Sequence, residues 1–338
     1  MHGRCLVAAA TLMAAASTAA AADQIRIVSS STVFPFASAV AEHFSRQSGF
    51  KSPVVESIGS GGGFKAFCRG LGEGTPDIAT ASRLMTPSER NACAASGVTE
   101  IAQIPIGRDG IVIAIAKSAH PFPLTRRQLF LALARRVPLD GRLTANPARQ
   151  WYDIDPQLPR MDILIYGPGP NHGTRDVLVE MVMEPACAEL PVISGLDEAA
   201  RKAACEAIRE DGAFVDVSET YSVLLRRVAM EPRAIGILPF SYVDQNTDKV
   251  QSLPFEGERP TYEAVLAGRY ALSRPLFVYV KKDHLGRTPG LRQYIAEFTS
   301  EKAWGKDGYL SDLGLIPLPD SERRADAARV RGVLGEQR

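Results

Sequence analysis

The stretch Ser52–Leu71, SPVVESIGSGGGFKAFCRGL, carries the pattern on which the fold prediction rests. An extended apolar start is followed by a loop of glycine and serine and then by the start of a helix. The same order recurs at IRIVSSSTVF, from Ile25, and at PDIATASRLMTPSERNACAASG, from Pro76. Alternating strands and helices predict an α/β fold with mostly parallel sheets flanked by helices.

Two apolar strands divide the chain into lobes. IVIAIAK (111–117) and RPLFVYVKK (274–282) lie on either side of a central block. We therefore expect one lobe built from residues 23–116 and 269–338, and a second lobe built from residues 117–268. The two strands would cross between the lobes as a hinge. The polar stretch that starts at Ser321 predicts a solvated C-terminal helix.

The N-terminal stretch predicts a targeting segment rather than part of the fold. Residues 1–22 combine a basic start at Arg4, an alanine-rich apolar run and small residues before Asp23. This pattern is typical of a secretory signal peptide that is cleaved near Ala22. Loss of Arg4 cancels the formal net charge of +1, and a neutral chain gives no indication of nucleic-acid binding.

The cysteines that follow the signal segment predict disulfides. Four remain, namely Cys68, Cys93, Cys187 and Cys205. An even number in an exported chain indicates disulfide pairing, and four cysteines allow three connectivities. We favour Cys68–Cys93 and Cys187–Cys205, because each pair closes a short local loop; free buried thiols are the alternative. No Cys-x-x-Cys pair or nearby histidine favours a metal site.

The glycine-rich loop does not match the known nucleotide motifs. A phosphate loop that starts at Gly59 would need glycine at Phe64 and a hydroxyl residue at Ala66. The dinucleotide motif fails at Phe64 as well. A nucleophile elbow centred on Ser60 fails because Ile58 stands where glycine is required.

Three strand-to-helix loops share small or hydroxyl residues that suit a tetrahedral anion. They are Ser29–Thr32, the loop around Ser60 and Gly61, and residues 171–174. Unpaired N–H groups and the helix dipole attract anions at such helix starts. Each loop alone could be an ordinary turn or an N-cap. Their recurrence in both predicted lobes favours one shared anion site.

Charged residues near these loops complete the candidate site. Arg83, Arg108 and Arg175 could each contact the anion, although a surface salt bridge is the commoner role of an arginine. Asp109 could accept the proton of monohydrogen phosphate and repel sulfate, which has no such proton. The alternative is that Asp109 pairs with Arg108 or caps a turn.

Together these motifs resemble the phosphate-binding proteins of bacterial ABC phosphate importers. The resemblance covers nearly the whole chain after the signal segment and rests on an ordered set of motifs: SSSTVFPFASAVAEHF, ESIGSGGGFKAF, PDIATASRLMTPSE, RDGIVIAI, HGTRD, RAIGILPFSYV and YALSRPLFVYV. It implies a two-lobed periplasmic binding protein of type II with a two-strand hinge. Such a protein has no catalytic residues, cofactor or metal, acts as a monomer, and hands phosphate to a membrane permease.

The resemblance also implies a set of phosphate ligands. Carried onto this chain, they are Ser31, Thr32, Val33, Ser60, Gly61, Ser82, Arg83, Asp109, His172, Gly173, Thr174 and Arg175. Two departures from the family pattern stand out. His172 replaces the usual serine, and the stretch 167–170, GPGP, stands where many members have an arginine. The charge partner would then be Arg83, Arg108 or Arg175, and a related oxyanion stays open as the ligand.

Two other classes of function are alternatives to transport. A sensor or adhesion protein could use the same fold without a permease. A secreted phosphatase would need a nucleophile with a base or a metal cluster. The five histidines, His2, His43, His120, His172 and His284, show no metal-ligand spacing, so we do not expect an enzyme.

Overall fold

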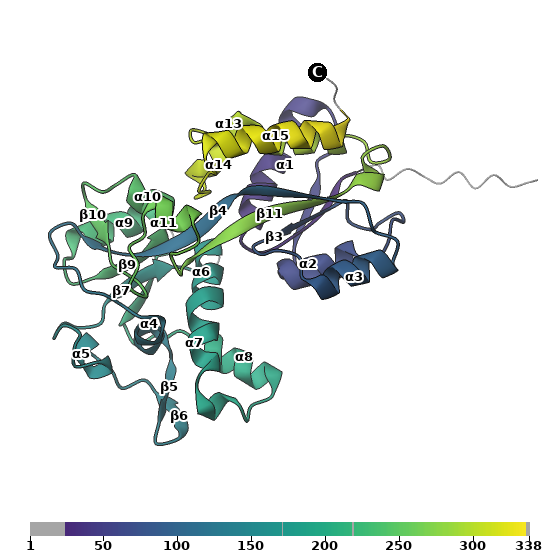
Figure 1. Cartoon of the computed structure of the whole chain (residues 1–338). Coiled ribbons are helices and arrows are strands. Elements are labelled where there is room, and N and C mark those ends of the chain that lie inside the picture. The colour runs from purple at the N-terminus through teal and green to yellow at the C-terminus, as the bar shows by residue number, and fades with distance from the viewer. Residues whose placement is uncertain (1–23, 171, 218–219, 336–338) are drawn as a thin grey trace, which may run out of the picture.

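The computed structural model describes residues 24–170, 172–217 and 220–335; the predicted signal segment lies outside this range. The described chain forms two lobes joined by two long neighbouring strands, β4 (Ile101–Ala116) and β11 (Ser273–Lys281) (Figure 1). Within the described residues, no helix is both long and apolar enough to span a bilayer.

One mixed sheet runs through both lobes. Its strands follow the order β2-β1-β3-β11-β4-β9-β7-β8, and β10 pairs with β4. Pairing is parallel among β1, β2 and β3 and among β7, β8 and β9, whereas β4 and β11 pair antiparallel with all their neighbours. The α/β class is therefore confirmed, but the sheet is mixed rather than mostly parallel, because the two long strands β4 and β11 pair antiparallel and the parallel pairs lie in its outer parts. Its other strands are β1 Arg26–Ser29, β2 Val54–Ser57, β3 Ile78–Ala81, β7 Ile165–Pro168, β8 Phe214–Val217, β9 Ile235–Pro239 and β10 Val250–Ser252. Strands β5 Arg136–Leu139 and β6 Arg142–Ala145 form a separate antiparallel pair.

Helices cover the sheet in both lobes. Their buried faces follow the apolar periodicity of the sequence, as in α1, where Phe36, Val40 and Phe44 are buried. The α-helices are α1 Phe34–Ser48, α2 Gly59–Phe67, α3 Pro87–Ala95, α4 Arg126–Leu133, α5 Trp151–Ile154, α6 Gly173–Leu178, α7 Glu184–Ala188, α8 Glu198–Glu206, α9 Tyr221–Met230, α10 Phe240–Asp244, α11 Tyr262–Leu266, α12 Leu291–Phe298, α13 Glu301–Trp304, α14 Tyr309–Asp312 and α15 Asp320–Leu334. A π-helix, η1 (Val179–Met183), and two 3₁₀ turns, η2 (Pro191–Ile193) and η3 (Lys282–His284), complete the set.

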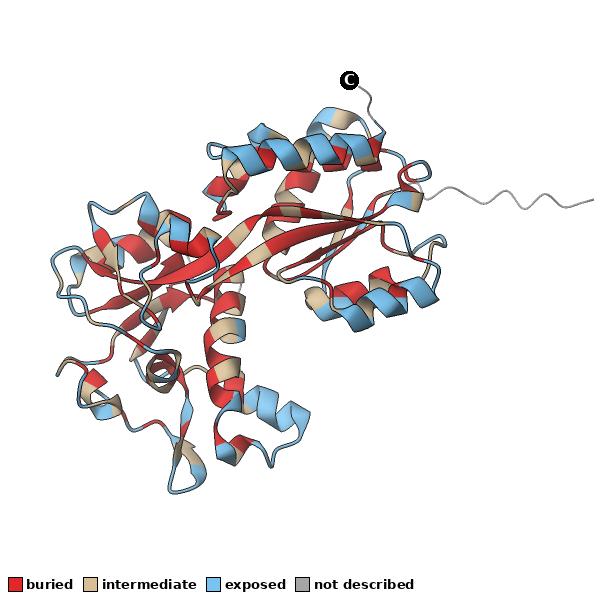
Figure 2. Ribbon diagram, viewed as in Figure 1, coloured by how far each residue is buried: buried red, intermediate tan, exposed pale blue. Residues whose placement is uncertain are grey.

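Strand β4 contributes to separate hydrophobic cores at its two ends. Residues Ala102, Ile104 and Ile106 pack in the core that contains α1 and α12, whereas Ile111–Ile115 pack in the core that contains α4 and α9. Buried residues fill both lobes and the strands between them (Figure 2). The segment between the two cores, 107–110, is thus the crossing point. The lobe boundaries at residues 116/117 and 268/269 stay a prediction.

Glycine permits the crossing strand to approach its neighbours closely. Gly107 has φ +146°, and a Cβ there would lie 2.8 Å from the Ile316 carbonyl oxygen. Such a backbone conformation is readily open only to glycine. The C-terminal segment can therefore pair with Arg108 through the two backbone hydrogen bonds to Ile316, both 2.8 Å long.

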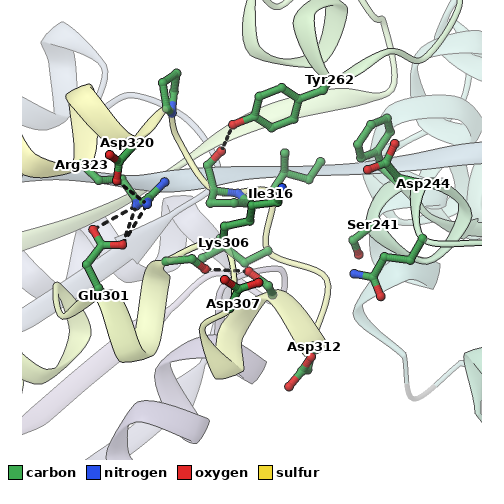
Figure 3. A pocket seen from close by; sticks show the side chains of 17 residues that line it. Ser241, Asp244, Tyr262, Glu301, Lys306, Asp307, Asp312, Ile316, Asp320 and Arg323 are labelled. Carbon is green, nitrogen blue, oxygen red and sulfur yellow. Dashed lines mark hydrogen bonds and ion pairs between the residues drawn. The ribbon is translucent and has the colours of Figure 1, made fainter.

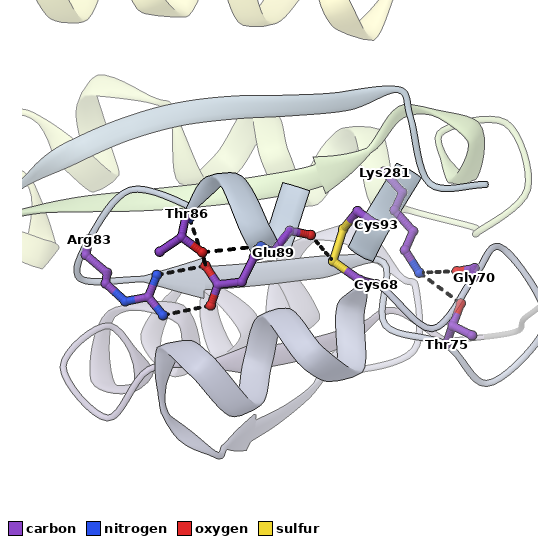
Figure 4. Close-up of a disulfide and its surroundings, with 8 residues drawn as sticks. All are labelled: Cys68, Gly70, Thr75, Arg83, Thr86, Glu89, Cys93 and Lys281. Carbon is purple, nitrogen blue, oxygen red and sulfur yellow. Dashed lines mark hydrogen bonds and ion pairs between the residues drawn. A yellow bond between two sulfur atoms is a disulfide. The ribbon is translucent and has the colours of Figure 1, made fainter. Parts of the chain in front are cut away.

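Both predicted disulfides are confirmed. Cys68 at the end of α2 is bonded to Cys93 of α3, and Cys187 of α7 is bonded to Cys205 of α8. Each bond ties two consecutive helices together. Figure 4 shows the first bond, with buried Lys281 nearby donating hydrogen bonds to Gly70 and Thr75.

The glycine-rich segment is helical, which corrects the expectation of a loop. Helix α2 begins at Gly59 and contains the whole GSGGG run. Gly59 has φ +76°, a conformation that lets the chain turn from β2 directly into the helix. Phe64 and Phe67 of this helix are buried, and Lys65 is exposed. Ser60 and Gly61 therefore lie in the first helical turn.

Candidate functional site

A cavity between the lobes collects five of the predicted ligand residues. It has a volume of about 350 Å³. Thr32 enters it from the first lobe, Asp109 from the crossing strand, and His172, Gly173 and Thr174 from the start of α6. The cavity thus joins segments from the two ends and the middle of the chain. Its remaining lining comes from Pro35, Phe36, Thr220, Tyr221, Pro239, Tyr242, Asp312, Leu313 and Gly314.

The carboxyl ends of β1, β2 and β3 place three predicted segments side by side. Ser29 pairs with Ser57 of β2 and Thr80 of β3 in the parallel ladder. The residues that follow these strands therefore meet at one edge of the sheet. Ser60 Oγ lies 3.4 Å from Ser82 Oγ and accepts a hydrogen bond from the Ser82 N–H at 3.3 Å. Neither serine lines the interlobe cavity. Ser60 lies in α2, and Ser82 directly follows β3.

The loop at Ser29–Thr32 contributes the side chain of Thr32 to the cavity, whereas the backbone N–H groups that follow it are already hydrogen-bonded. The Val33 N–H donates to Ser30 Oγ at 3.2 Å, and the Phe34 N–H donates to the Ser30 carbonyl at 2.9 Å. The Val33 N–H is thus already used inside the turn that starts α1. Thr32 is buried and lines the cavity, whereas Ser31 Oγ lies 3.4 Å from Glu180 Oε1.

The loop of the second lobe is supported by aromatic residues. Thr174 Oγ1 and Tyr221 Oη are hydrogen-bonded at 2.5 Å, and the Tyr221 ring packs at 5.1 Å from His172 and 5.0 Å from Tyr242. Burial raises the pKa of Tyr221 to about 12, so its phenol is neutral near pH 7. Sequence reasoning did not identify Tyr221 at the start of α9 or Tyr242 of α10 as site residues, because it selected strand-to-helix loops by their glycine, serine and threonine residues.

Asp109 is a buried acceptor in the cavity wall. Its residue is 8% exposed, and Oδ2 has no hydrogen-bond partner among the described residues. Burial raises the pKa of Asp109, and the nearby guanidinium of Arg274 opposes that shift. The carboxylate can therefore accept a hydrogen bond from an O–H group of a ligand.

Two of the predicted charge partners are already paired. Arg83 donates two hydrogen bonds to Glu89, at 2.9 and 2.8 Å, and stacks on Phe64. Arg175 pairs with Asp216 at 2.5 Å. Neither lines the interlobe cavity.

The third predicted charge partner, Arg108, alternates with Asp109 along β4, so their side chains lie on opposite faces of the sheet. Its guanidinium lies near Gly268, because a Cβ built on Gly268 would be 3.5 Å from Arg108 Nη2. Arg108 therefore points away from the side of β4 on which Asp109 meets the cavity.

Arg274 is a cation that contacts the cavity wall, and sequence reasoning did not identify it. It is opposite Asp109 in the β11–β4 ladder, and Asp109 Oδ2 lies 3.8 Å from Arg274 Nε. Its Nη2 donates to Thr32 and its Nη1 to Glu180. Arg274 thus lies directly behind two residues that line the cavity. An arginine inside the apolar strand RPLFVYV is the sequence signal that could have revealed it.

A larger pocket lies beside this site but has a different character. It has a volume of about 1100 Å³ and runs between α10, α11 and the C-terminal segment. Figure 3 shows Arg323 at one end, paired with Glu301 and Asp320, and Asp244 near the other. Its described lining carries five acidic side chains against two basic ones, Lys306 and Arg323, and includes no predicted ligand residue. The smaller cavity is therefore the candidate site.

The family of the chain follows from a comparison with family models. A model described as a PBP superfamily domain matches residues 14–302. The chain belongs to the PBP superfamily. In this member of the superfamily, the cavity lies between the lobes, beside the strands that connect them.

Individual relatives of this PBP superfamily member cover most of its length. Protein SphX of Synechococcus elongatus is 28% identical over 309 residues, which is 89% of this chain and 80% of that protein. The phosphate-binding protein PstS of Staphylococcus saprophyticus is 25% identical, over 91% of this chain and 84% of that protein. A crystal structure described as "a possible phosphate binding protein from Planctomyces limnophilus DSM 3776" superposes with a TM-score of 0.72 at 25% identity, covering 93% of this chain and 100% of that one.

Proposed function

We propose that this chain binds inorganic phosphate between its two lobes and delivers it to the membrane permease of an ABC importer. The observation that carries the proposal is the cavity in which Thr32, Asp109 and Thr174 meet. Two hydroxyl groups and the helix start at Gly173 suit a tetrahedral oxyanion. The names of PstS and the Planctomyces protein, which are similar over most of their length, support the same ligand.

Asp109 gives the proposed site a means of selecting phosphate. Monohydrogen phosphate has an O–H group that can donate a hydrogen bond to Asp109 Oδ2, which has no other hydrogen-bond partner among the described residues. Sulfate has no O–H group at neutral pH. A site built to pair with a ligand O–H rejects the analogue that lacks it, because the buried acceptor is then left unpaired. Arsenate, which carries the same proton, is expected to compete.

Isothermal titration of the desalted protein with phosphate, arsenate and sulfate tests this function. We expect heat with phosphate and arsenate, and none or much weaker binding with sulfate. In Asp109→Asn, the preference for phosphate over sulfate should narrow by roughly tenfold or more, since the side-chain amide can donate to either anion. Absence of heat with all three anions would contradict the proposal, and a preference for sulfate would point to another oxyanion.

The remaining parts of the proposal concern export and lobe movement. Residues 1–22 would direct export to the periplasm, where an oxidising environment suits the two disulfides. There the protein would act as a monomer, and its lobes would close about the crossing segments of β4 and β11.

Each of these points has its own test. N-terminal sequencing of the exported protein checks the cleavage site near Ala22; an uncleaved N-terminus would contradict it. Small-angle scattering with and without phosphate checks closure.

No observation favours a phosphatase or a sensor over transport. No group of three metal-ligating side chains is arranged to hold an ion in the described part of the chain. Among the described residues that line the cavity, His172 is the one histidine, and its ring packs against Tyr221. We therefore propose binding and delivery without chemistry on the ligand.

A further inference from the structure

Arg274 is a buried cation at the boundary between the lobes. The residue is 9% exposed and sits at the start of β11, opposite Asp109 of the crossing strand. Its Nε has no hydrogen-bond partner among the described residues. A buried guanidinium with an unused donor can accept an additional anionic partner at little further desolvation cost.

Glu180 occupies the position of an anion beside this cation. It lies on η1, which continues α6 in the second lobe, and its carboxylate accepts a hydrogen bond from Arg274. The other carboxylate oxygen lies 3.4 Å from Ser31 Oγ in the first lobe. A hydroxyl of the first predicted anion loop and the buried guanidinium therefore both contact one carboxylate, as they could contact an oxyanion.

Negative charges on the helix that carries Glu180 weaken its contact with Arg274, so that another anion can replace Glu180 there. Asp176 and Glu184 lie four residues before and after it, and like charges at this spacing repel on a helix. The pKa of Asp176 is raised by burial and by the charge of Glu180. A π-helix also widens the turn at 179–183, a feature common at functional sites. The Glu180 side chain is 41% exposed, so it can turn toward water when another anion takes its place.

From this geometry we infer that Arg274 is the cationic ligand of the anion site and that Glu180 acts as an internal occupant that the incoming anion displaces. Arg274 would then supply the positive charge that the stretch 167–170 lacks. Exchange of one anion for another keeps the buried guanidinium paired throughout, which avoids the large cost of an unpaired buried charge. Release of Glu180 also breaks its contacts between the lobes and leaves the lobes free to adjust around the ligand. The inference rests on the proposed function, because it names the cation of that same site.

A double-mutant cycle measured by phosphate titration tests the inference. Glu180→Gln should bind phosphate roughly tenfold more tightly, because a charge-assisted contact no longer competes. Arg274→Ala should bind at least roughly tenfold more weakly, with Arg274→Lys retaining part of the affinity because it keeps the charge but not the planar donor set. The gain from Glu180→Gln should vanish in the Arg274→Ala background. Glu189→Gln, which removes an exposed charge beyond the end of α7, is the matched control and should leave affinity unchanged.

The outcomes separate this inference from the proposed function. If the parent binds phosphate and Arg274→Lys and Arg274→Ala, both folded by circular dichroism, bind it equally well, the inference fails and the function stands. If Glu180→Gln gains no more than Glu189→Gln, or keeps its gain without Arg274, the inference also fails. If the parent binds no anion but Glu180→Gln does, the occupant role is supported and the parent's function as a phosphate carrier is not. If neither binds any anion, both are overturned.

Discussion

Asp109 of β4 and Arg274 of β11 face each other across the two strands that join the lobes, with Asp109 Oδ2 3.8 Å from Arg274 Nε. This distance is too long for a hydrogen bond, and both atoms lack other partners among the described residues. An orphan donor and an orphan acceptor side by side are complementary to a ligand that both accepts and donates. A monohydrogen oxyanion has both functions.

Replacement of Asp109 should stabilise the anion-free protein at neutral pH. Its pKa is raised by burial, so the ionised form opposes folding, and this penalty is present above the folded-state pKa. The penalty is relieved as pH falls toward the ordinary value of 3.8, where the parent protonates the same group. Asp109→Asn should therefore exceed the parent in melting temperature at pH 7, and the difference should shrink as the pH falls toward 3.8 and be absent below it. Scanning calorimetry at several pH values measures it; a lower melting temperature for the variant at pH 7 would show that the pairing with Arg274 outweighs desolvation.

Removal of the Tyr221 hydroxyl should weaken anion binding moderately. Tyr221 Oη and Thr174 Oγ1 are hydrogen-bonded at 2.5 Å, which orients the threonine hydroxyl in the cavity wall. A lost neutral hydrogen bond is worth about 1 kcal/mol, so Tyr221→Phe should raise the phosphate Kd roughly fivefold. Tyr242→Phe is the control, because it also removes one hydroxyl from a ring that packs on Tyr221 but leaves the hydrogen bond between Tyr221 and Thr174 intact. Equal losses in the two variants would indicate packing rather than orientation of Thr174.

Loss of Arg83 should affect stability more than binding. Its guanidinium is bound to Glu89, and the side chain is 42% exposed, so the pair is worth about 0.5–1 kcal/mol after screening by solvent. We expect Arg83→Ala to lower the free energy of unfolding in urea by this amount and to change phosphate affinity less than about twofold. Arg90→Ala on the exposed face of α3 controls for charge. A tenfold loss of affinity specific to Arg83→Ala would restore Arg83 as the cation of the site.

Lys281 should make the protein more stable at alkaline pH. Burial lowers the pKa of Lys281 to about 8 from the ordinary 10.5, so the unfolded chain holds a proton in this interval that the folded chain has lost. The free energy of unfolding should therefore rise between these pH values, by up to about 1.4 kcal/mol per unit. Lys281→Met should show a flat dependence over this range in urea titrations. A parallel rise in the variant would assign the effect to another group.

The fold class could be predicted from the sequence because it depends on local patterns of apolar residues. Alternation and helical spacing around Val54 and Phe36 mark strands and helices, and short loops limit how the cysteines can pair. The start of α2 was missed because the positive φ of Gly59 lets a helix begin where glycine usually indicates a loop.

Two of the three predicted loops contribute to the cavity, the loop around Ser60 does not, and the contacts that depend on strand register were missed. Thr32, Asp109 and Gly173–Thr174 meet in one cavity as expected. Arg274 and Asp109 are far apart in the chain, and only the antiparallel register of β4 and β11 makes them neighbours. Glu180 depends in the same way on how η1 meets the first lobe. Neither relationship has a signature in a single sequence.

The place of Asp109 in the crossing segment 107–110 has a mechanical consequence. Points on a rotation axis do not travel, whereas Thr32 and Thr174, which lie on opposite lobes, sweep through an arc when the lobes rotate. If the axis passes through this segment, the proton acceptor stays still while the hydroxyl groups converge on the ligand. The identity of the anion would then be read at a stationary point before the lobes meet, so an anion without the proton would be turned away from the open form.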